Sequence, residues 1–117
     1  MSKVPANPAP ASQPDAITLE SGQTYRFPTN KTLQHAVRLS IIDDKPVMFD
    51  YWVGSIDKSV LIGVRNDESK EKILVRSEEE YTSPISKIFK IEQEYIIVTE
   101  NSIYIVDAAI PTKRISA

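Results

Sequence analysis

Period-two alternation of apolar and polar residues is the feature that most constrains how this chain can fold. One such series, bounded by short polar connections, runs through Leu33, His35, Val37, Leu39 and Ile41. Side chains of a strand point alternately to its two faces, so this pattern predicts a strand with one inner face. Further segments of the same character follow at 47–53, 60–65, 72–76, 85–91, 95–99 and 102–106. With no stretch of helical periodicity long enough to count, the pattern predicts an all-β fold: a small antiparallel meander barrel or sandwich of about seven strands.

The N-terminal residues have a different composition. Four of the eight prolines, Pro5, Pro8, Pro10 and Pro14, lie among Ala, Ser, Asn and Gln in the first sixteen positions. Proline has no N–H to donate to a ladder, and the segment has little apolar surface to bury. We therefore predict a flexible, extended Pro/Ala-rich arm at 1–20, a single β domain at 21–110 and a C-terminal tail at 111–117.

The single tryptophan belongs to the second predicted strand. If residues 42–46 form a five-residue loop, the hairpin register places Arg38 opposite Asp50, an arrangement in which opposite charges stabilise the pair. The same register points Met48 and Trp52 outward. An outward tryptophan is either covered by the arm or a loop, or it is available to a partner.

The last predicted hairpin carries apolar residues on both faces. With residues 100–101 as a two-residue loop, Ile97 lies opposite Tyr104 and Tyr95 lies opposite Val106 on one face, and the other face is equally apolar. A small barrel buries only one face of each strand. The second face must therefore meet another sheet, the arm or another protein, and a terminal strand at a sheet edge invites strand addition.

The residues expected to contact a partner are thus the surplus apolar side chains of the sheet and the prolines of the arm. They are Met48, Trp52, Tyr95, Ile97, Tyr104, Pro5, Pro8 and Pro10.

Residue types that carry catalysis or bind metals are scarce. The chain has no cysteine, which excludes disulfides and thiolate ligands, and its single histidine, His35, falls in an apolar series that favours a structural role. The acidic groups at 43–44, 67–68 and 78–80 lack the spacing of a calcium loop. We predict no catalytic residue, no metal ligand and no cofactor, and we expect the protein not to be an enzyme.

The chain carries no signal for a membrane. No apolar run approaches the roughly 20 residues that span a bilayer, and the N-terminus lacks the continuous apolar segment of a signal peptide. We therefore expect a soluble intracellular protein without a membrane partner. The net charge of −2 provides no global field for nucleic acid.

Three stretches, "DKPVMFDYWVGSIDKSVLIGVRN", "EEEYTSPISKIF" and "EYIIVTENSIYIV", resemble small uncharacterised proteins encoded by large DNA viruses of protists and algae. The resemblance covers residues 43–106 and carries no catalytic motif. It implies a role in the virion or in contact with the host.

These observations favour a noncatalytic structural or adaptor module that docks into a larger protein assembly, such as a viral particle, as a homo- or hetero-oligomer. The alternative is a small β-barrel that binds single-stranded nucleic acid, because six aromatic side chains could stack on bases: Tyr25, Phe27, Trp52, Tyr81, Tyr95 and Tyr104.

Overall fold

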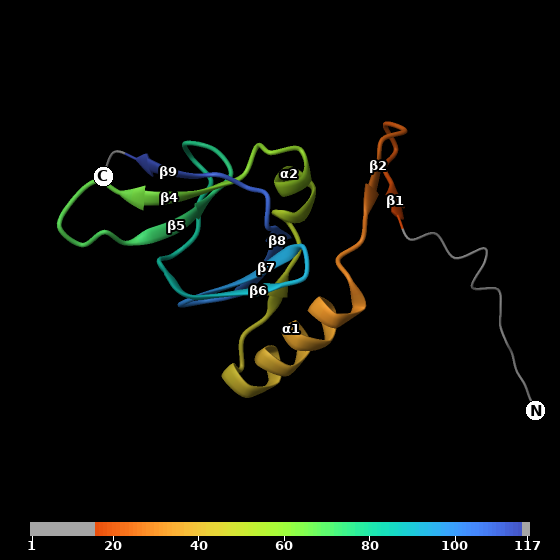
Figure 1. Ribbon diagram of the computed structural model, residues 1–117, viewed down its shortest axis with the longest axis horizontal. Helices are drawn as coiled ribbons and strands as arrows, with labels where there is room; N and C mark the ends of the chain where they lie inside the picture. The colour runs from red at the N-terminus through yellow and green to blue at the C-terminus, as the bar shows by residue number, and fades with distance from the viewer. Residues whose placement is uncertain (1–15, 116–117) are drawn as a thin grey trace, which may run out of the picture.

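The computed structural model describes residues 16–115, and strands dominate this part of the chain (Figure 1). The described elements are β1 (Ala16–Thr18), β2 (Thr24–Arg26), α1 (Asn30–Asp43), β3 (Val47–Met48), α2 (Trp52–Ile56), β4 (Leu61–Arg65), β5 (Lys72–Val75), β6 (Ile85–Ile91), β7 (Glu94–Thr99), β8 (Ile103–Asp107) and β9 (Thr112–Ile115). The strands form three sheets with the orders β1-β2, β3-β8-β7-β6 and β5-β4-β9. The β-rich character predicted from the sequence is confirmed.

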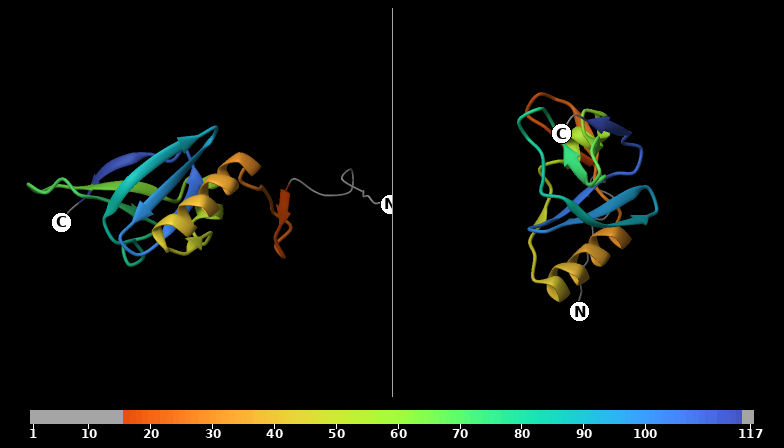
Figure 2. Two further views of the ribbon diagram at one scale, coloured as in Figure 1. Left: turned by 90° about the horizontal axis from the view of Figure 1, so that it is seen from below. Right: turned by 90° about the vertical axis from the view of Figure 1, so that its left-hand side faces the viewer.

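The β3-β8-β7-β6 sheet is the centre of the molecule, and both of its faces are covered. Figures 1 and 2 show α1 along one face and the β5-β4-β9 sheet on the other. Toward the second sheet, Ile97 and Val106 are buried in one cluster with Ile62 and Leu74. Toward the helices, the residues buried in a second cluster are Ile96, Val98, Ile103 and Ile105 with Ala36 and Trp52. The apolar surplus of the last hairpin is therefore buried within this chain.

The β7–β8 hairpin has the register predicted from its two-residue loop. Val98 pairs with Ile103, and Ile97 pairs with Tyr104. The hairpin does not lie at a sheet edge, however, because β8 also pairs with β3 and β7 also pairs with β6. The long edge strand is β6, which has a register shift after Ile85 and an exposed Lys87; bulges and lysines of this kind discourage strand addition.

The predicted strand at 33–41 is wrong, because these residues belong to α1. Thr29 caps the helix: its hydroxyl accepts from the backbone N–H of Thr32 at 3.4 Å. Asp44, with φ of 55°, ends the helix in the left-handed conformation, and its N–H donates to the carbonyl of Ser40. The predicted Arg38–Asp50 strand pair consequently does not exist.

Two pairings are parallel, so an all-antiparallel meander is also wrong. Of the predicted strand at 47–53, only β3 is a strand, and it pairs in parallel with β8. The rest of that segment leads into α2, which begins at Trp52. Parallel pairing requires a long connection between its strands, and here the chain between β3 and β8 supplies the whole β4–β7 region.

The predicted domain boundaries need correction at both ends. The C-terminal tail at 111–117 contains β9, which pairs in parallel with β4. Residues 16–18 of the predicted arm form β1, which pairs with β2. The remainder of the arm, 1–15, lies outside the described residues.

Candidate functional site

Trp52 is covered by the chain itself. Its side chain is 2% exposed, and its indole Nε1–H donates to the backbone carbonyl of Arg26 at 2.8 Å. The guanidinium of Arg26 lies 4.9 Å from the centroid of the tryptophan ring, within the range of a cation–π contact. Cover by another part of the chain, one of the two alternatives that the sequence left open, is the arrangement found.

The other predicted contact residues of the sheet are buried or half-buried. Ile97 is fully buried, and Tyr95 and Tyr104 pack against the cluster between the two sheets. The ring of Tyr104 meets that of Tyr51 edge-on, with 5.2 Å between centroids. The β5-β4-β9 sheet covers this face, which is one of the three alternatives that the sequence left open.

Met48 is half-buried in β3. The three predicted contact residues of the arm, Pro5, Pro8 and Pro10, lie outside the described residues. Their role in contacting a partner stays a prediction.

A network of charges ties β2 to the central sheet. One guanidinium nitrogen of Arg26 donates to Glu94 at 2.6 Å and the other donates to Asp107 at 2.7 Å. The Glu94 side chain is fully buried and also accepts from the hydroxyls of Thr29 and Thr32, at 3.1 and 2.5 Å. Burial alone would raise the pKa of Glu94, but hydrogen bonds from Thr32 and Arg26 hold it below its ordinary value.

This network has the properties of a structural anchor. Glu94 lies at the N-terminal end of α1, where its carboxylate accepts from the backbone N–H of Thr29 at 3.2 Å and complements the helix dipole. Arg26 is matched by two carboxylates. The hydrogen bonds that Glu94 accepts are given by three residues of the β2–α1 segment, so its place in the fold accounts for its burial.

The outer face of α1 is the apolar surface that the fold leaves open. Small residues, Thr32 and Ala36, face the sheet and let the helix approach it closely. Larger apolar side chains face away: Val37 is 56% exposed, Ile41 is 76% exposed and Ile42 is 69% exposed. Isolated exposed apolar residues are ordinary, whereas a contiguous set of them marks an interaction surface.

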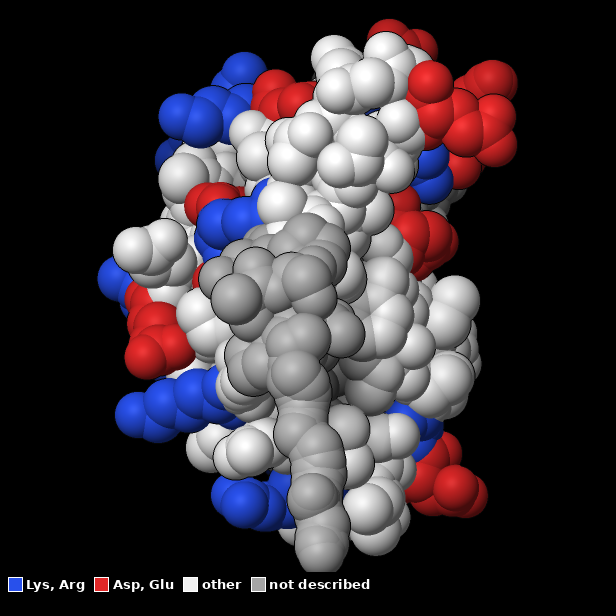
Figure 3. Space-filling view, turned by 90° about the vertical axis from the view of Figure 1, so that its right-hand side faces the viewer, with Lys and Arg blue, Asp and Glu red and all other residues white. Residues whose placement is uncertain are grey.

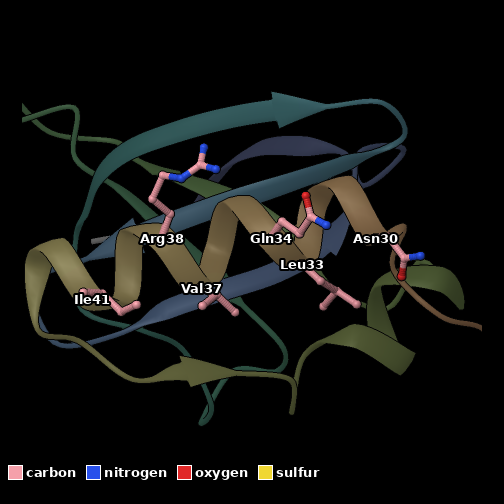
Figure 4. Close-up of a pocket in the computed structure, with 6 residues that line it drawn as sticks. All are labelled: Asn30, Leu33, Gln34, Val37, Arg38 and Ile41. Carbon is pink, nitrogen blue, oxygen red and sulfur yellow. The ribbon is translucent and has the colours of Figure 1, made fainter.

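These side chains line a groove along the helix. Leu33, Val37 and Ile41, spaced four residues apart, form one row that points to the same side of α1, and Gln34 and Arg38 point to the other side (Figure 4). Together with Asn30 they line a shallow, open hollow of about 500 Å³. We call this hollow the α1 groove; it has one apolar wall and one polar wall.

A second hollow, of about 700 Å³, lies against the β5-β4-β9 sheet. Its apolar lining comes from Leu61, Ile73, Val75 and Ile115, and its polar lining includes Arg65, Arg76, Glu78 and the 55% exposed Tyr81. Both arginines have a glutamate nearby, at 3.8 Å in each pair. The hollow therefore offers an aromatic ring beside two arginines that are only loosely paired.

Charge and metal-binding potential are limited over the described part of the chain. In the face shown in Figure 3, Lys and Arg lie mainly along one edge, where Asp and Glu lie among them, and Asp and Glu predominate along the opposite edge. Residues 16–115 contain no group of three or more His, Asp or Glu side chains placed to hold a metal ion.

Neither described helix has the length and apolar content needed to cross a bilayer.

Comparisons with protein-family models, with curated proteins and with solved structures found no significant match to this chain. The resemblance to small viral proteins therefore stays a prediction.

The sequence interpretation missed the α1 groove because it placed Val37 and Ile41 on the inner face of a strand. Two signals could have identified the helix. Thr29, which follows a proline, is a favoured N-cap residue. Leu33, Val37 and Ile41 also satisfy the four-residue spacing of one helix face.

Proposed function

We propose that this chain is a noncatalytic structural or adaptor module that docks into a larger protein assembly through the outer face of α1. The observation that carries the proposal is the apolar row of α1, in which Val37 and Ile41 are more than half exposed and Leu33 is half-buried against the core. The apolar side chains of β7 and β8 are satisfied inside the fold, but Val37 and Ile41 stay more than half exposed among the described residues. An interface would cover them.

Magnitudes indicate how large the interface has to be. Fully burying an exposed valine or isoleucine side chain contributes about 1.5–3 kcal/mol. Association costs about 4–15 kcal/mol in lost translational and rotational freedom. Two or three such side chains therefore supply only the centre of a contact, and polar residues around α1 or the N-terminal segment have to extend it.

The N-terminal segment provides that extension in our proposal. A proline-rich segment has a low entropic cost of ordering in an extended conformation, which suits it to lie along a partner. Deleting residues 2–15 should leave the thermal unfolding of the described domain unchanged and should weaken assembly. Unchanged incorporation of the shortened chain would remove the segment from the proposal.

The docking role of α1 is tested with a tagged full chain in the cells that express it. We expect the chain to migrate in a complex larger than its own mass and to crosslink through residues near α1. Replacing Val37 and Ile41 together with aspartate should release the chain from the complex, since two charges would enter a desolvated contact. The viral resemblance makes a viral particle the first assembly to search.

The matched control is Ile88→Asp, which places the same charge on another partly exposed isoleucine, on β6. Circular dichroism establishes that each variant is folded. If the α1 variant is folded and remains in the complex, α1 is not the docking face. If the control is released as readily as the α1 variant, the contact is not specific to α1.

Binding of single-stranded nucleic acid is the second candidate, and the hollow beside Tyr81 favours it. An exposed aromatic ring next to Arg65 and Arg76 offers base stacking together with positive charge. Anisotropy of a labelled oligonucleotide measures binding directly. Affinity should fall steeply with salt and should fall again on Tyr81→Ala. Absence of binding at low ionic strength eliminates this candidate.

A further inference from the structure

The shape of the α1 groove selects a helix as its occupant. The groove runs between two rows of side chains at four-residue spacing: Leu33, Val37 and Ile41 on one side, and Asn30, Gln34 and Arg38 on the other. A row of this kind is a ridge in helix packing, and the space between two such rows accepts the matching ridge of another helix. Two helices that pack in this way cross at about −50°.

The charges beside the groove select an acidic partner. Lys31 and Arg38 are seven residues apart, so they lie on the same side of α1; Arg38 lines the groove, and Lys31 lies farther from the apolar row. Within residues 16–115, neither of them takes part in an ion pair. A cation at the rim of an apolar contact is complemented by a carboxylate on the partner.

The same charges argue against an antiparallel pair of α1 helices from two copies of this chain. In an antiparallel pair of α1 helices related by a two-fold axis near Val37, both Arg38 side chains would lie on the same side of the interface. Both Lys31 side chains would lie on that side as well. Like charges would then be brought together along one edge of the contact.

We propose that the α1 groove binds an amphipathic helix of a partner protein, whose apolar row packs on Leu33, Val37 and Ile41 and whose Asp or Glu side chains pair with Arg38. This inference rests on the proposed docking function of α1 and adds the chemistry of the partner. Arg38 is the residue that sets the specificity for acidic helices.

A displayed library of random peptides, selected on the full chain and counter-selected on the Val37→Asp variant, tests the inference. We expect the enriched peptides to carry apolar residues at spacings of three and four, with Asp or Glu beside them. They should become helical on binding, as measured by circular dichroism. Arg38→Glu should weaken such a peptide by about tenfold or more.

A charge exchange provides the matched control. Replacing the acidic residues of an enriched peptide with lysine should restore its binding to the Arg38→Glu variant and abolish its binding to the natural chain. Arg114→Glu, which makes the same charge reversal on β9, should leave the affinity unchanged. Equal losses for the Arg38 and Arg114 variants would overturn the assignment of specificity to Arg38.

Failure of this inference is distinguishable from failure of the docking function. Peptides that depend on Val37 but are basic, neutral or extended overturn the acidic-helix partner and leave docking through α1 intact. Peptides that bind the Val37→Asp variant equally well, or no enrichment, overturn the α1 groove as the site. A dimer of this chain that dissociates on Val37→Asp identifies a second copy as the occupant of the α1 groove. Peptide binding that is seen only after removal of residues 2–15 identifies that segment as the occupant. Either result overturns the inference.

Discussion

Replacing Glu94 with alanine tests the physical basis of the fold most directly. The buried carboxylate receives hydrogen bonds from Arg26, Thr29 and Thr32, so it joins β2, the start of α1 and β7 at one point. Removing one partner of a buried ion pair costs about 3–5 kcal/mol when the remaining charge loses all of its compensation, so this range is the upper bound. The loss should not exceed this range, since Arg26 keeps Asp107 at 2.7 Å and Thr32 can still donate to the carbonyl of Ile91 at 3.4 Å.

The measurement is urea unfolding followed by circular dichroism at neutral pH. A domain of this size is stabilised by about 5–15 kcal/mol in total, so the alanine variant should lose a large part of its free energy of unfolding. Glu94→Gln retains an acceptor but not the charge, and it should lose about 1.5–3 kcal/mol. Glu100→Ala removes an exposed loop carboxylate and should change stability by no more than about 0.5 kcal/mol.

Two results would refute this reasoning. A loss below about 1 kcal/mol for Glu94→Ala, with an unchanged denaturant slope, would mean that the network contributes little net free energy. Equal losses for the alanine and glutamine variants would mean that the charge of Glu94 is not what the network needs.

Three further predictions follow from the same structure. The hydrogen bonds that hold the pKa of Glu94 below its ordinary value stabilise the fold at pH values above the unfolded-state pKa. This contribution to the free energy of unfolding should be lost as the pH falls through the folded-state pKa. In Glu94→Gln, the free energy of unfolding should therefore change less with pH over this acidic range. Gly63→Ala would bring a Cβ to 2.8 Å from Ile115 and should destabilise by about 1–3 kcal/mol in thermal unfolding. Ile97→Ala, at a fully buried position, should cost about 2–5 kcal/mol, whereas Ile41→Ala, at a 76% exposed position, should cost no more than about 0.5 kcal/mol; comparable losses at both positions would contradict the burial pattern.

The β7–β8 hairpin shows what local sequence can specify. A two-residue loop at 100–101 fixes which residues face each other, and any slip of one residue would exchange the two faces of a strand. The predicted register and the strand at 85–91 therefore agree with the structure. The apolar character of both hairpin faces was also visible in the sequence.

The segment at 33–41 shows where local sequence is insufficient. Its apolar residues satisfy a period of two and also a spacing of four, so the pattern alone allows a strand or a helix. The deciding contacts are distant in the sequence. Glu94 accepts hydrogen bonds at the start of the helix, and the sheet face with Ile96 and Ile105 packs against Ala36.

The same distinction applies to the candidate site. The sequence correctly indicated more apolar surface than one sheet face can bury, but it placed the surplus at Trp52 and Tyr104. In the structure, β2 and the β5-β4-β9 sheet cover those residues, and the surplus appears on the outer face of α1 instead.

The sequence by itself determined that the chain is rich in strands, that its last hairpin has one register and that thiol chemistry is absent. Only the tertiary structure decided that residues 30–43 form a helix, that β3 and β9 pair in parallel, and which apolar side chains stay exposed. The reason is that turn geometry and side-chain alternation act between neighbours in the chain. Which face is buried depends instead on segments that meet only when the whole chain has folded.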